Sequence, residues 1–389
     1  MSDNKKKKIM IIAGEISGDL YGHPLVLELM KSGRDIEISG IGGPRMKSAG
    51  MKTYYDSSSW GTIGMIEAIK KLPYLYWAYY DIGEKLKRVM PDVLVLIDYP
   101  GFNMRLCRYA KQLGIPTIYY FPPAKWSYNH EDVCDAARTI TRVAAPFEHT
   151  YDIYKKAGAS VEFVGNPLLE IVKTRCSREE ILKKLGAAGG EKIISLLPGS
   201  RSMEVRYMLP VLAETAAMLG AKIKNARFIM PVSSSTISKG TGITLEYIKN
   251  VINSYGADVS VETDMTYDIL AASDFSIITS GTATLEAACL MTPMVIVYKV
   301  SLLTEIYART MTSLPKYFGL PNLILNKAVV PEFIQTNVTP EIISEAVVEI
   351  LNSPDKLADM KNELKAVVKN LGDIGATKKV SQMILEMVK

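Results

Sequence analysis

The segment Ser280–Glu286, Ser-Gly-Thr-Ala-Thr-Leu-Glu, has the residue types and the spacing of an anion-binding turn. It directly follows the apolar run Phe275–Thr279, which predicts a buried strand, and it opens an apolar helix. Backbone N–H groups and the dipole at a helix N-terminus attract phosphate, and small residues let a diphosphate approach closely. A glutamate one turn further on can bind the vicinal hydroxyls of a ribose. We therefore predict a sugar-nucleotide site formed by Ser280, Gly281, Thr282, Ala283 and Glu286.

A second turn of this kind lies upstream. The apolar run Ile193–Leu197 leads through a proline into Gly199, Ser200 and Arg201, just before a helical pattern. A guanidinium group presents a fixed fork of donors that suits phosphate oxygens. Either turn alone is as readily an ordinary connection between a strand and a helix, but two in the same half of the chain favour phosphate binding. We therefore assign Gly199, Ser200 and Arg201 to the same site.

Three carboxylates in the first half of the chain are candidates for proton transfer. Asp98 closes the apolar run Val93–Ile97, which places it at the carboxyl end of a strand, where it can accept a proton from a sugar hydroxyl. Glu15 and Asp19 flank a small-residue turn after Ile9–Ala13. That turn is not the G-x-G-x-x-G of dinucleotide sites, and its two carboxylates repel phosphate, so hydroxyl recognition or proton abstraction suits them better. Helix capping is the alternative for Asp98 and for Asp19.

Short apolar runs alternate with helical periodicity along the whole chain, as parallel α/β layers require. The runs predict strands at Ile9–Ala13, Ile36–Ile41, Val93–Ile97, Thr117–Phe121, Arg142–Ala145, Val161–Val164, Ile193–Leu197, Arg227–Pro231, Val259–Glu262, Phe275–Thr279 and Met294–Tyr298. A proline-containing turn at Gly165–Pro167 separates two series. We predict an α/β fold of two Rossmann-like domains facing a cleft, the glycosyltransferase-B type. Residues 1–166 form an acceptor domain, 167–345 a UDP-sugar donor domain, and 346–389 helices that cross back to the N-terminal domain.

The composition excludes several classes of protein. The chain has 389 residues, 48% of them hydrophobic, and a net charge of +5 from dispersed lysines, which argues against nucleic acid as a partner. No apolar run reaches the roughly 18 residues of a membrane span. The basic start Lys5–Lys8 precedes a short apolar run without a cleavage site, so it predicts a first strand rather than a signal peptide. Scattered cysteines and histidines indicate neither disulfides nor a metal site, and the expected compartment is the cytoplasm.

The segment Leu72–Tyr80 holds five aromatic residues and precedes the basic run Lys85–Arg88. Aromatic rings with polar tips beside lysines favour a membrane interface, and the acyl chains of a lipid substrate need such an apolar surface. The alternative is that one face of this helix is simply part of the core. We predict reversible attachment to an anionic membrane surface through this segment.

Six ordered motifs make the chain resemble the lipid A disaccharide synthases, a family of inverting glycosyltransferases with two Rossmann-like domains. The resemblance covers almost the whole chain. The motifs are Gly14-Glu15-x-Ser17-Gly18-Asp19, Gly40-Ile41-Gly42-Gly43-Pro44-Arg45-Met46, Ile97-Asp98-x-Pro100-x-Phe102-Asn103, Leu197-Pro198-Gly199-Ser200-Arg201-x-x-Glu204-Val205, Ser280-Gly281-Thr282-Ala283-Thr284-Leu285-Glu286 and Leu320-Pro321-Asn322.

The resemblance implies a reaction. 2,3-Diacylglucosamine would pass from its UDP ester to 2,3-diacylglucosamine 1-phosphate, giving a β-1′,6-linked disaccharide and UDP. By that resemblance Asp98 is the base, Arg201 and the turn Ser280–Ala283 hold the diphosphate, and Glu286 and Asn322 fix the nucleoside end. The family needs no metal and no cofactor, and it acts at the inner face of the cytoplasmic membrane.

One segment departs from the family pattern. Members usually carry Ser-Pro-x-x-Trp-Ala-Trp after the fourth strand, whereas this chain reads Phe121-Pro-Pro-Ala-Lys-Trp-Ser-Tyr128. One tryptophan remains as Trp126, Tyr128 replaces the other, and Lys125 adds a charge. The identity of the acceptor is therefore less fixed than that of the donor.

Two other functions stay open at the level of sequence. One is a different UDP-sugar enzyme of the same fold, acting on another lipid acceptor or resembling a UDP-N-acetylglucosamine 2-epimerase, which would not need the tyrosine-rich surface. The other is a non-catalytic relative that binds nucleotide or lipid, although the presence of Asp98, Arg201 and Glu286 speaks against it. The sequence fixes neither acyl length nor oligomeric state, and a homodimer is one option.

Overall fold

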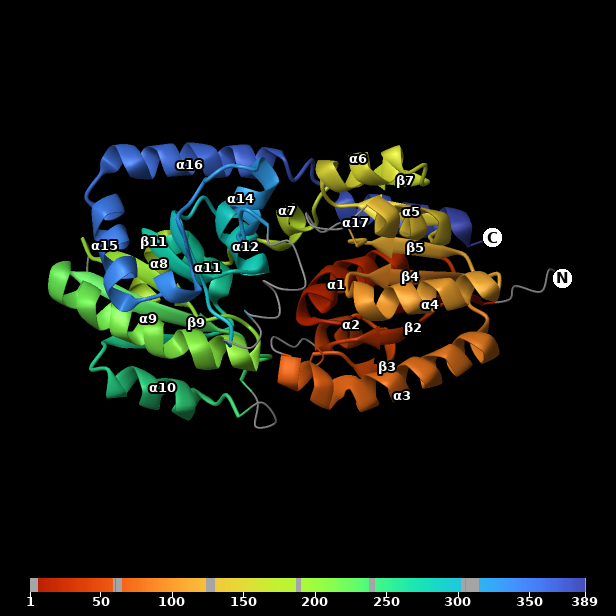
Figure 1. Cartoon of the computed structure of the whole chain (residues 1–389), viewed down its shortest axis with the longest axis horizontal. Helices are drawn as coiled ribbons and strands as arrows, with labels where there is room; N and C mark the ends of the chain where they lie inside the picture. Colours follow the sequence, from red (N-terminus) through yellow and green to blue (C-terminus); the bar gives the residue numbers. More distant parts are fainter. Residues whose placement is uncertain are drawn as a thin grey trace. The chain divides into compact units, whose positions relative to one another are not determined.

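The computed structural model describes residues 6–58, 60, 65–123, 130–186, 190–237, 242–301, 305 and 315–388. The chain forms two compact units (Figure 1). The first consists of Met1–Thr62, Ile66–Ile171 and Leu371–Lys389, and the second of Val172–Asn370 with Ile63–Met65. Apart from the short stretch Ile63–Met65, the chain therefore leaves the first unit once and returns to it near its end.

The first unit is built on a seven-stranded parallel sheet of order β3-β2-β1-β4-β5-β6-β7. Its strands are β1 (Lys7–Ala13), β2 (Ile36–Gly42), β3 (Lys52–Asp56), β4 (Val93–Ile97), β5 (Thr117–Tyr120), β6 (Arg142–Ala145) and β7 (Val161–Phe163). The central strands are apolar on both faces, as expected where helices cover both sides of a parallel sheet.

Helices cover both faces of this sheet. They are α1 (Ile16–Met30), α2 (Pro44–Ser48), α3 (Met65–Val89), α4 (Pro100–Gln112), α5 (His130–Thr139), α6 (Glu148–Lys156), α7 (Leu168–Ile171) and α17 (Ala376–Met387). A core cluster joins one face of the sheet to α3, α4 and α5, with Trp60 and Tyr119 fully buried in it. Helices α1 and α17 pack against each other.

The second unit has a six-stranded parallel sheet of order β10-β9-β8-β11-β12-β13. Its strands are β8 (Lys192–Leu197), β9 (Ala226–Val232), β10 (Val259–Thr263), β11 (Phe275–Thr279), β12 (Met294–Tyr298) and β13 (Glu332–Ile334). Its helices are α8 (Arg178–Lys184), α9 (Ser202–Lys222), α10 (Leu245–Ser254), α11 (Thr266–Ala272), α12 (Thr282–Cys289), α14 (Leu320–Leu325), α15 (Pro340–Leu351) and α16 (Pro354–Lys369), with a 3₁₀ turn η1 (Gln335–Asn337).

The predicted fold class is confirmed, and the differences lie at the sheet edges and the domain borders. The structure adds two strands that the sequence did not predict, β3 and β13, both at an edge of their sheet and only partly buried. The main crossing between the units falls after Ile171 rather than at residue 166. Of the segment 346–389, which was expected to cross back to the N-terminal domain, the end of α15 and all of α16 belong to the second unit, and only α17 lies in the first.

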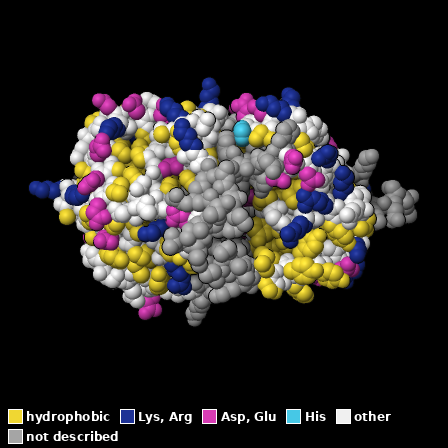
Figure 2. All heavy atoms as spheres, in the orientation of Figure 1, with side chains coloured by type: hydrophobic (Ala, Val, Ile, Leu, Met, Phe, Trp, Pro, Cys, Tyr) yellow, Lys and Arg dark blue, Asp and Glu magenta, His cyan; other side chains and the backbone are white. Residues whose placement is uncertain are grey.

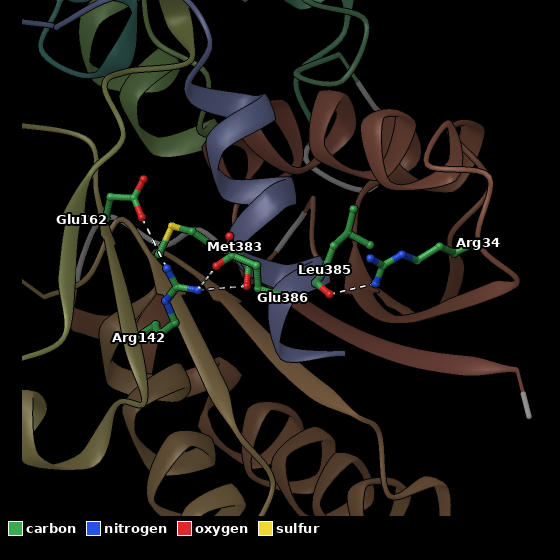
Figure 3. A network of polar contacts seen from close by, with 6 residues as sticks. All are labelled: Arg34, Arg142, Glu162, Met383, Leu385 and Glu386. Carbon is green, nitrogen blue, oxygen red and sulfur yellow. Dashed lines mark hydrogen bonds and ion pairs between the residues drawn. The ribbon is translucent and has the colours of Figure 1, made fainter. Parts of the chain in front are cut away.

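Two arginines fix the last turns of α17 to the first unit (Figure 3). Arg34 donates to the carbonyl oxygen of Leu385 at 2.8 Å, and Arg142 donates to the carboxylate of Glu386 at 2.7 Å. Carbonyl groups at a helix C-terminus have no partner within the helix, and cations complement the negative end of its dipole. The returning segment is thus held by charge-assisted contacts as well as by packing.

We expect Arg142→Ala to lower the free energy of unfolding of the first unit by about 1–2 kcal/mol, because charge-assisted hydrogen bonds stabilise more than neutral ones. Urea unfolding followed by tryptophan fluorescence measures it, since Trp60 and Trp77 both lie in this unit. The matched control is Arg108→Ala, which removes only an exposed pair with Asp135 and should cost less than about 1 kcal/mol. Equal losses in the two variants would show that α17 does not depend on this contact.

Candidate active site

Both sheets place the candidate residues where the strand order reverses. In each sheet the first strand of the unit lies beside the fourth, β1 beside β4 and β8 beside β11. The last residues of these pairs are in register, Ala13 with Ile97 and Leu197 with Ile278. Ligands of open α/β sheets bind outside the carboxyl ends of strands at this reversal. The four turns singled out in the sequence follow these four strands.

In the second unit, the turn after β8 is held by Glu204 from the first turn of α9. One carboxylate oxygen of Glu204 accepts the backbone N–H groups of Ser200 at 2.9 Å and Arg201 at 3.1 Å, and the other accepts the Arg201 guanidinium at 2.9 Å. Glu204 is buried, whereas the Arg201 side chain is 31% exposed. The buried acid therefore orients a cation that still reaches solvent at the strand end.

Gly199 is required at this turn for two reasons. Its φ is +106°, a conformation that side-chain-bearing residues rarely adopt. A Cβ at this position would also lie 2.6 Å from both the Cβ and a carboxylate oxygen of Glu204. The glycine thus allows the close contact through which Glu204 binds the turn.

The end of β12 lies within electrostatic reach of the same group. Burial raises the pKa of the Tyr298 hydroxyl, and the charge of Glu204 raises it further while Arg201 lowers it. Tyr298 is therefore a neutral side chain bordering the Glu204–Arg201 pair. The sequence analysis did not single it out, because a tyrosine at the end of an apolar run carries no distinguishing signal.

The turn after β11 opens α12 without any capping side chain. Gly281 occupies the N-cap position, so no N-cap side chain binds the first backbone N–H groups of α12. The Ser280 hydroxyl donates to the carbonyl oxygen of Phe318 at 2.9 Å, and the Thr284 hydroxyl donates to that of Gly281. Glu286 lies half-buried, one turn in, with the Tyr267 hydroxyl 3.5 Å from its carboxylate.

Asn322 has a different role from the one the resemblance implied. Its side chain is buried, its oxygen accepts the N–H groups of Val329 and Val330, and its nitrogen donates to Val330 and to Glu332. These bonds use the hydrogen-bonding capacity of an amide side chain, so none is left for a nucleoside. Asn322 shapes the loop instead.

Glu332 is the organising residue that the sequence analysis missed. Besides Asn322, its carboxylate accepts the N–H groups of Phe318 at 2.8 Å and Gly319 at 2.9 Å. Because the carbonyl of Phe318 in turn binds the Ser280 hydroxyl, Glu332 is linked to the anion-binding turn through a single residue. It lies on β13, an edge strand that no apolar run marks.

In the first unit, Asp98 follows β4 in an unusual conformation. Asp98 and Tyr99 both have positive φ, +51° and +52°, which is rare for two consecutive residues other than glycine. The Asp98 N–H donates to the carbonyl oxygen of Tyr120 at 3.0 Å, and the residue is half-buried. The alternative of Asp98 as a helix cap does not hold, because Tyr99 is the N-cap residue of α4 and makes no side-chain cap.

Glu15 lies close to this turn. Burial raises the pKa of the Tyr99 hydroxyl to about 12, with a further contribution from the charge of Glu15. Gly14 makes this approach possible, since a Cβ there would be 2.2 Å from the Tyr99 ring. The structure thus brings Glu15 and the Asp98–Tyr99 turn together at the carboxyl ends of the neighbouring strands β1 and β4.

Asp19, by contrast, is a positioning residue rather than a base. It is buried, and its carboxylate accepts three backbone N–H groups, from Gly43 at 2.9 Å, Arg45 at 3.1 Å and Met46 at 2.9 Å. These are the first N–H groups of α2, so Asp19 caps that helix from a distance of about two dozen residues along the chain. Asp19 is therefore a helix cap, as the alternative proposed, but it caps α2 rather than α1, the helix in which it lies.

The tyrosine-rich segment lies on α3 and is largely exposed. Tyr76, Trp77 and Tyr80 are 72%, 57% and 63% exposed. Figure 2 shows hydrophobic side chains gathered over the region where Figure 1 places α3. The opposite face of the helix, with Ala78 and Ile82, is fully buried in the core. One face of this helix is therefore core, and the other exposes the aromatic side chains on which the membrane prediction depends.

Three further expectations concern the altered segment, a metal site and a membrane-spanning helix. The departure from the family pattern at Lys125, Trp126 and Tyr128 lies outside the described residues. Within the described ranges, no three histidine, cysteine, aspartate or glutamate residues gather as a metal site would require. No described helix combines the length and the apolarity that crossing a bilayer requires.

Two Rossmann-type sheets, each with its candidate residues where the strand order reverses, have the architecture of the glycosyltransferase-B fold. The family model described as lipid-A-disaccharide synthetase matches residues 9–387. The chain therefore belongs to that family, and the predicted class of hexosyltransferase is confirmed.

The similar proteins agree with this assignment. The chain is 35% identical to the lipid-A-disaccharide synthase of Geobacter sulfurreducens, covering 100% of this chain and 99% of that protein. It is 34% identical to that of Neisseria gonorrhoeae, covering 94% and 93%. Among solved structures, the UDP-GlcNAc 2-epimerase of Neisseria meningitidis has a TM-score of 0.65 at 14% identity, covering 97% of this chain and 99% of that one. MurG of Acinetobacter baumannii has 0.57 at 14%, covering 98% and 99%. These structures share the fold.

Proposed function

We propose that the protein transfers 2,3-diacylglucosamine from its UDP ester to the 6-hydroxyl of 2,3-diacylglucosamine 1-phosphate, forming a β-1′,6-linked disaccharide and releasing UDP. The observation that carries this proposal is the full-length family relation of a chain that keeps a half-buried carboxylate, Asp98, at one strand reversal and Arg201 at the other. The first provides a base, and the second provides charge for a leaving diphosphate.

The donor is proposed to bind the second unit. The N-terminus of α12 and the Arg201 guanidinium follow adjacent strands, so both can approach one diphosphate. Positive groups that are fixed in advance stabilise the charge that develops on departing UDP, a task that other transferases give to a metal ion. The epimerase of the same fold is bound to UDP-GlcNAc in its structure, which supports a UDP-sugar as the ligand.

The nucleoside end is proposed to lie against Glu286 and the loop before α14. Glu286 keeps a carboxylate at the helix turn that follows the diphosphate seat, where it can accept hydrogen bonds from ribose hydroxyls. Asn322 and Glu332 hold the loop in shape without touching the ligand. The donor site is thus built from two binding turns and one supporting network.

Asp98 is proposed to take the proton of the acceptor hydroxyl while the donor's anomeric carbon is attacked from the face opposite UDP. An alcohol becomes an adequate nucleophile only when a base shares its proton, and no enzyme-bound sugar is needed for inversion. Glu15, which follows the neighbouring strand β1, is assigned to hydroxyl recognition. Because these groups complete the reaction by acid–base and electrostatic means, we propose that neither a metal nor a cofactor takes part.

Mass spectrometry of the products tests this function. Purified protein is incubated with UDP-2,3-diacylglucosamine and 2,3-diacylglucosamine 1-phosphate, and we expect the tetra-acylated disaccharide 1-phosphate and UDP in equal amounts. Release of UDP without disaccharide would indicate another acceptor, as the altered segment before Tyr128 allows. Epimerised UDP-N-acetylhexosamine would indicate a 2-epimerase, and no turnover of any donor would indicate a binding protein.

The exposed aromatic face of α3 is proposed to attach the protein to the inner face of the cytoplasmic membrane. Large aromatic residues rarely remain exposed together unless they contact a ligand, a partner or a lipid surface. Lys87 and Arg88 end the same helix and can attract anionic head groups. Lipid substrates could then enter the site from the bilayer without crossing water.

We expect the Tyr76→Ser and Trp77→Ser double variant to lose most of its binding to anionic vesicles, because it removes two large exposed aromatic side chains that would insert into the interface. Flotation at low and at high salt measures it, and binding of the unmodified protein should weaken as salt rises. The control is Tyr255→Ser, which alters an exposed tyrosine of the second unit. If the unmodified protein fails to float at low salt, the membrane proposal is wrong.

A further inference from the structure

Two buried side chains converge on one backbone oxygen next to the proposed base. The carbonyl oxygen of Asp98 accepts the Tyr119 hydroxyl at 2.8 Å and the side-chain nitrogen of Asn103 at 2.7 Å. Tyr119 comes from β5 and is fully buried, and Asn103 comes from the first turn of α4 and is fully buried. Neither side chain points its polar group at solvent, so both are used to hold this peptide.

The peptide needs to be held because its conformation is unfavourable. A left-handed residue with a Cβ costs on the order of 1–2 kcal/mol, and Asp98 and Tyr99 are consecutive residues of this kind. Glycine would adopt the same conformation without strain. A strained pair persists only where surrounding contacts determine it, and such pairs are common at active sites.

The anchoring reaches three neighbouring strands. The Asn103 side chain also lies 3.3 Å from the carbonyl oxygen of Ile12 on β1 and 3.2 Å from that of Ile97 on β4. Tyr119 adds β5 through its hydroxyl, and the Asp98 N–H binds the backbone of the next residue on that strand. The turn is therefore fixed to the carboxyl ends of β1, β4 and β5 together.

We propose that Tyr119, with Asn103, is a positioning residue that sets the direction of the Asp98 carboxylate for proton transfer. The proposal rests on the proposed role of Asp98 as base. The Tyr119 hydroxyl holds the carbonyl end of the Asp98 peptide, so its loss lets that peptide rotate and moves the carboxylate away from the acceptor hydroxyl. Displacement of a reacting group by a fraction of an ångström slows chemistry without altering ligand affinity.

The chain supplies a matched control. Tyr120 is the neighbouring residue on β5 and is equally buried, and its hydroxyl has no hydrogen-bond partner among the described residues. Tyr119→Phe and Tyr120→Phe each remove one buried hydroxyl from the same strand, but only the first removes a bond to Asp98. An effect of removing a buried hydroxyl from this strand, irrespective of its hydrogen bond, would appear in both.

We expect Tyr119→Phe to lower kcat about tenfold, the factor that loss of one well-aligned hydrogen bond allows, with KM for the donor unchanged. Tyr120→Phe should keep kcat within about twofold of the unmodified enzyme. Site-specific 3-fluorotyrosine at position 119 retains the hydroxyl and should keep the unmodified kcat. If Tyr119→Phe folds poorly, the fluorotyrosine variant provides the test. Loss of activity with the hydroxyl still present would contradict the proposal.

The second measurement places the same change in an Asp98→Asn background. If Tyr119 acts only through the Asp98 carboxylate, Tyr119→Phe should have little further effect there, because coupled residues give non-additive changes. The same tenfold loss in both backgrounds would overturn the positioning role while leaving Asp98 as the base. Normal turnover of Asp98→Asn itself would instead overturn the proposed role of Asp98 as the base, so the two failures are distinguishable.

Discussion

Asp98→Asn is expected to lower kcat by about 10²–10⁴-fold, the usual contribution of a general base. Asparagine keeps the shape of the side chain and leaves the backbone contacts of the turn in place, including the bonds to the Asp98 carbonyl and N–H. What it removes is the ability to take up the proton of the acceptor hydroxyl. Binding of UDP should be nearly unchanged, because the donor is proposed to bind the other unit.

The control for this variant is Asp92→Asn, the same change just before the amino end of β4, where Asp92 accepts the Lys8 N–H at 2.7 Å. It should leave kcat within a few-fold of the unmodified enzyme. Steady-state kinetics with both lipid substrates, together with calorimetry of UDP, separate the possibilities. A loss of donor binding in Asp98→Asn would indicate a role in positioning. Normal turnover combined with an inactive Glu15→Gln would transfer the role of base to the first loop.

Most of the strands that the sequence predicted are buried on both faces, and the partly buried edge strands β7 and β10 were predicted from their alternating valine and phenylalanine residues. A run such as Val93–Ile97 is apolar throughout because helices cover it on both sides. β3 and β13 were not predicted because β3 begins and ends with a charged residue around polar and tyrosine positions, and β13 has three residues that begin with Glu332, so neither forms an apolar run. Glu332 was not predicted for the same reason, because it lies on β13, where its carboxylate accepts N–H groups of the loop before α14.

The positions of the candidate residues were easier to predict than their roles. A turn between an apolar run and a helix locates Asp19 and Asp98 at strand ends, but it does not say which groups a carboxylate will meet. The carboxylate of Asp19 accepts the N–H groups at the start of α2, and the side chain of Asn322 makes its hydrogen bonds to the loop that follows α14. Such bonds join residues whose proximity depends on the folded chain. The role of Tyr119 could not be predicted for the same reason, because in the sequence a tyrosine within a buried strand looks like any other core residue.

Arg201→Ala combined with Glu286→Ala is expected to weaken UDP binding by roughly 30-fold or more, since loss of a desolvated charged partner costs on the order of 2–5 kcal/mol. Arg201 contributes most, because its removal also leaves the buried Glu204 carboxylate without its side-chain cation beside the diphosphate seat. Two negative groups would then face each other at the strand end. Titration calorimetry with UDP measures the change.

Lys356→Ala is the control for that titration. It also removes one positive charge from the second unit, but Lys356 is 51% exposed and pairs with Glu349 on α15, outside the turns that follow the strands. Its affinity for UDP should therefore stay within about twofold, because an exposed charge at that distance is screened by salt. If the Arg201 and Glu286 double variant binds UDP as tightly as this control does, the diphosphate is not held by these turns, and the donor site must be sought on other strands of the unit.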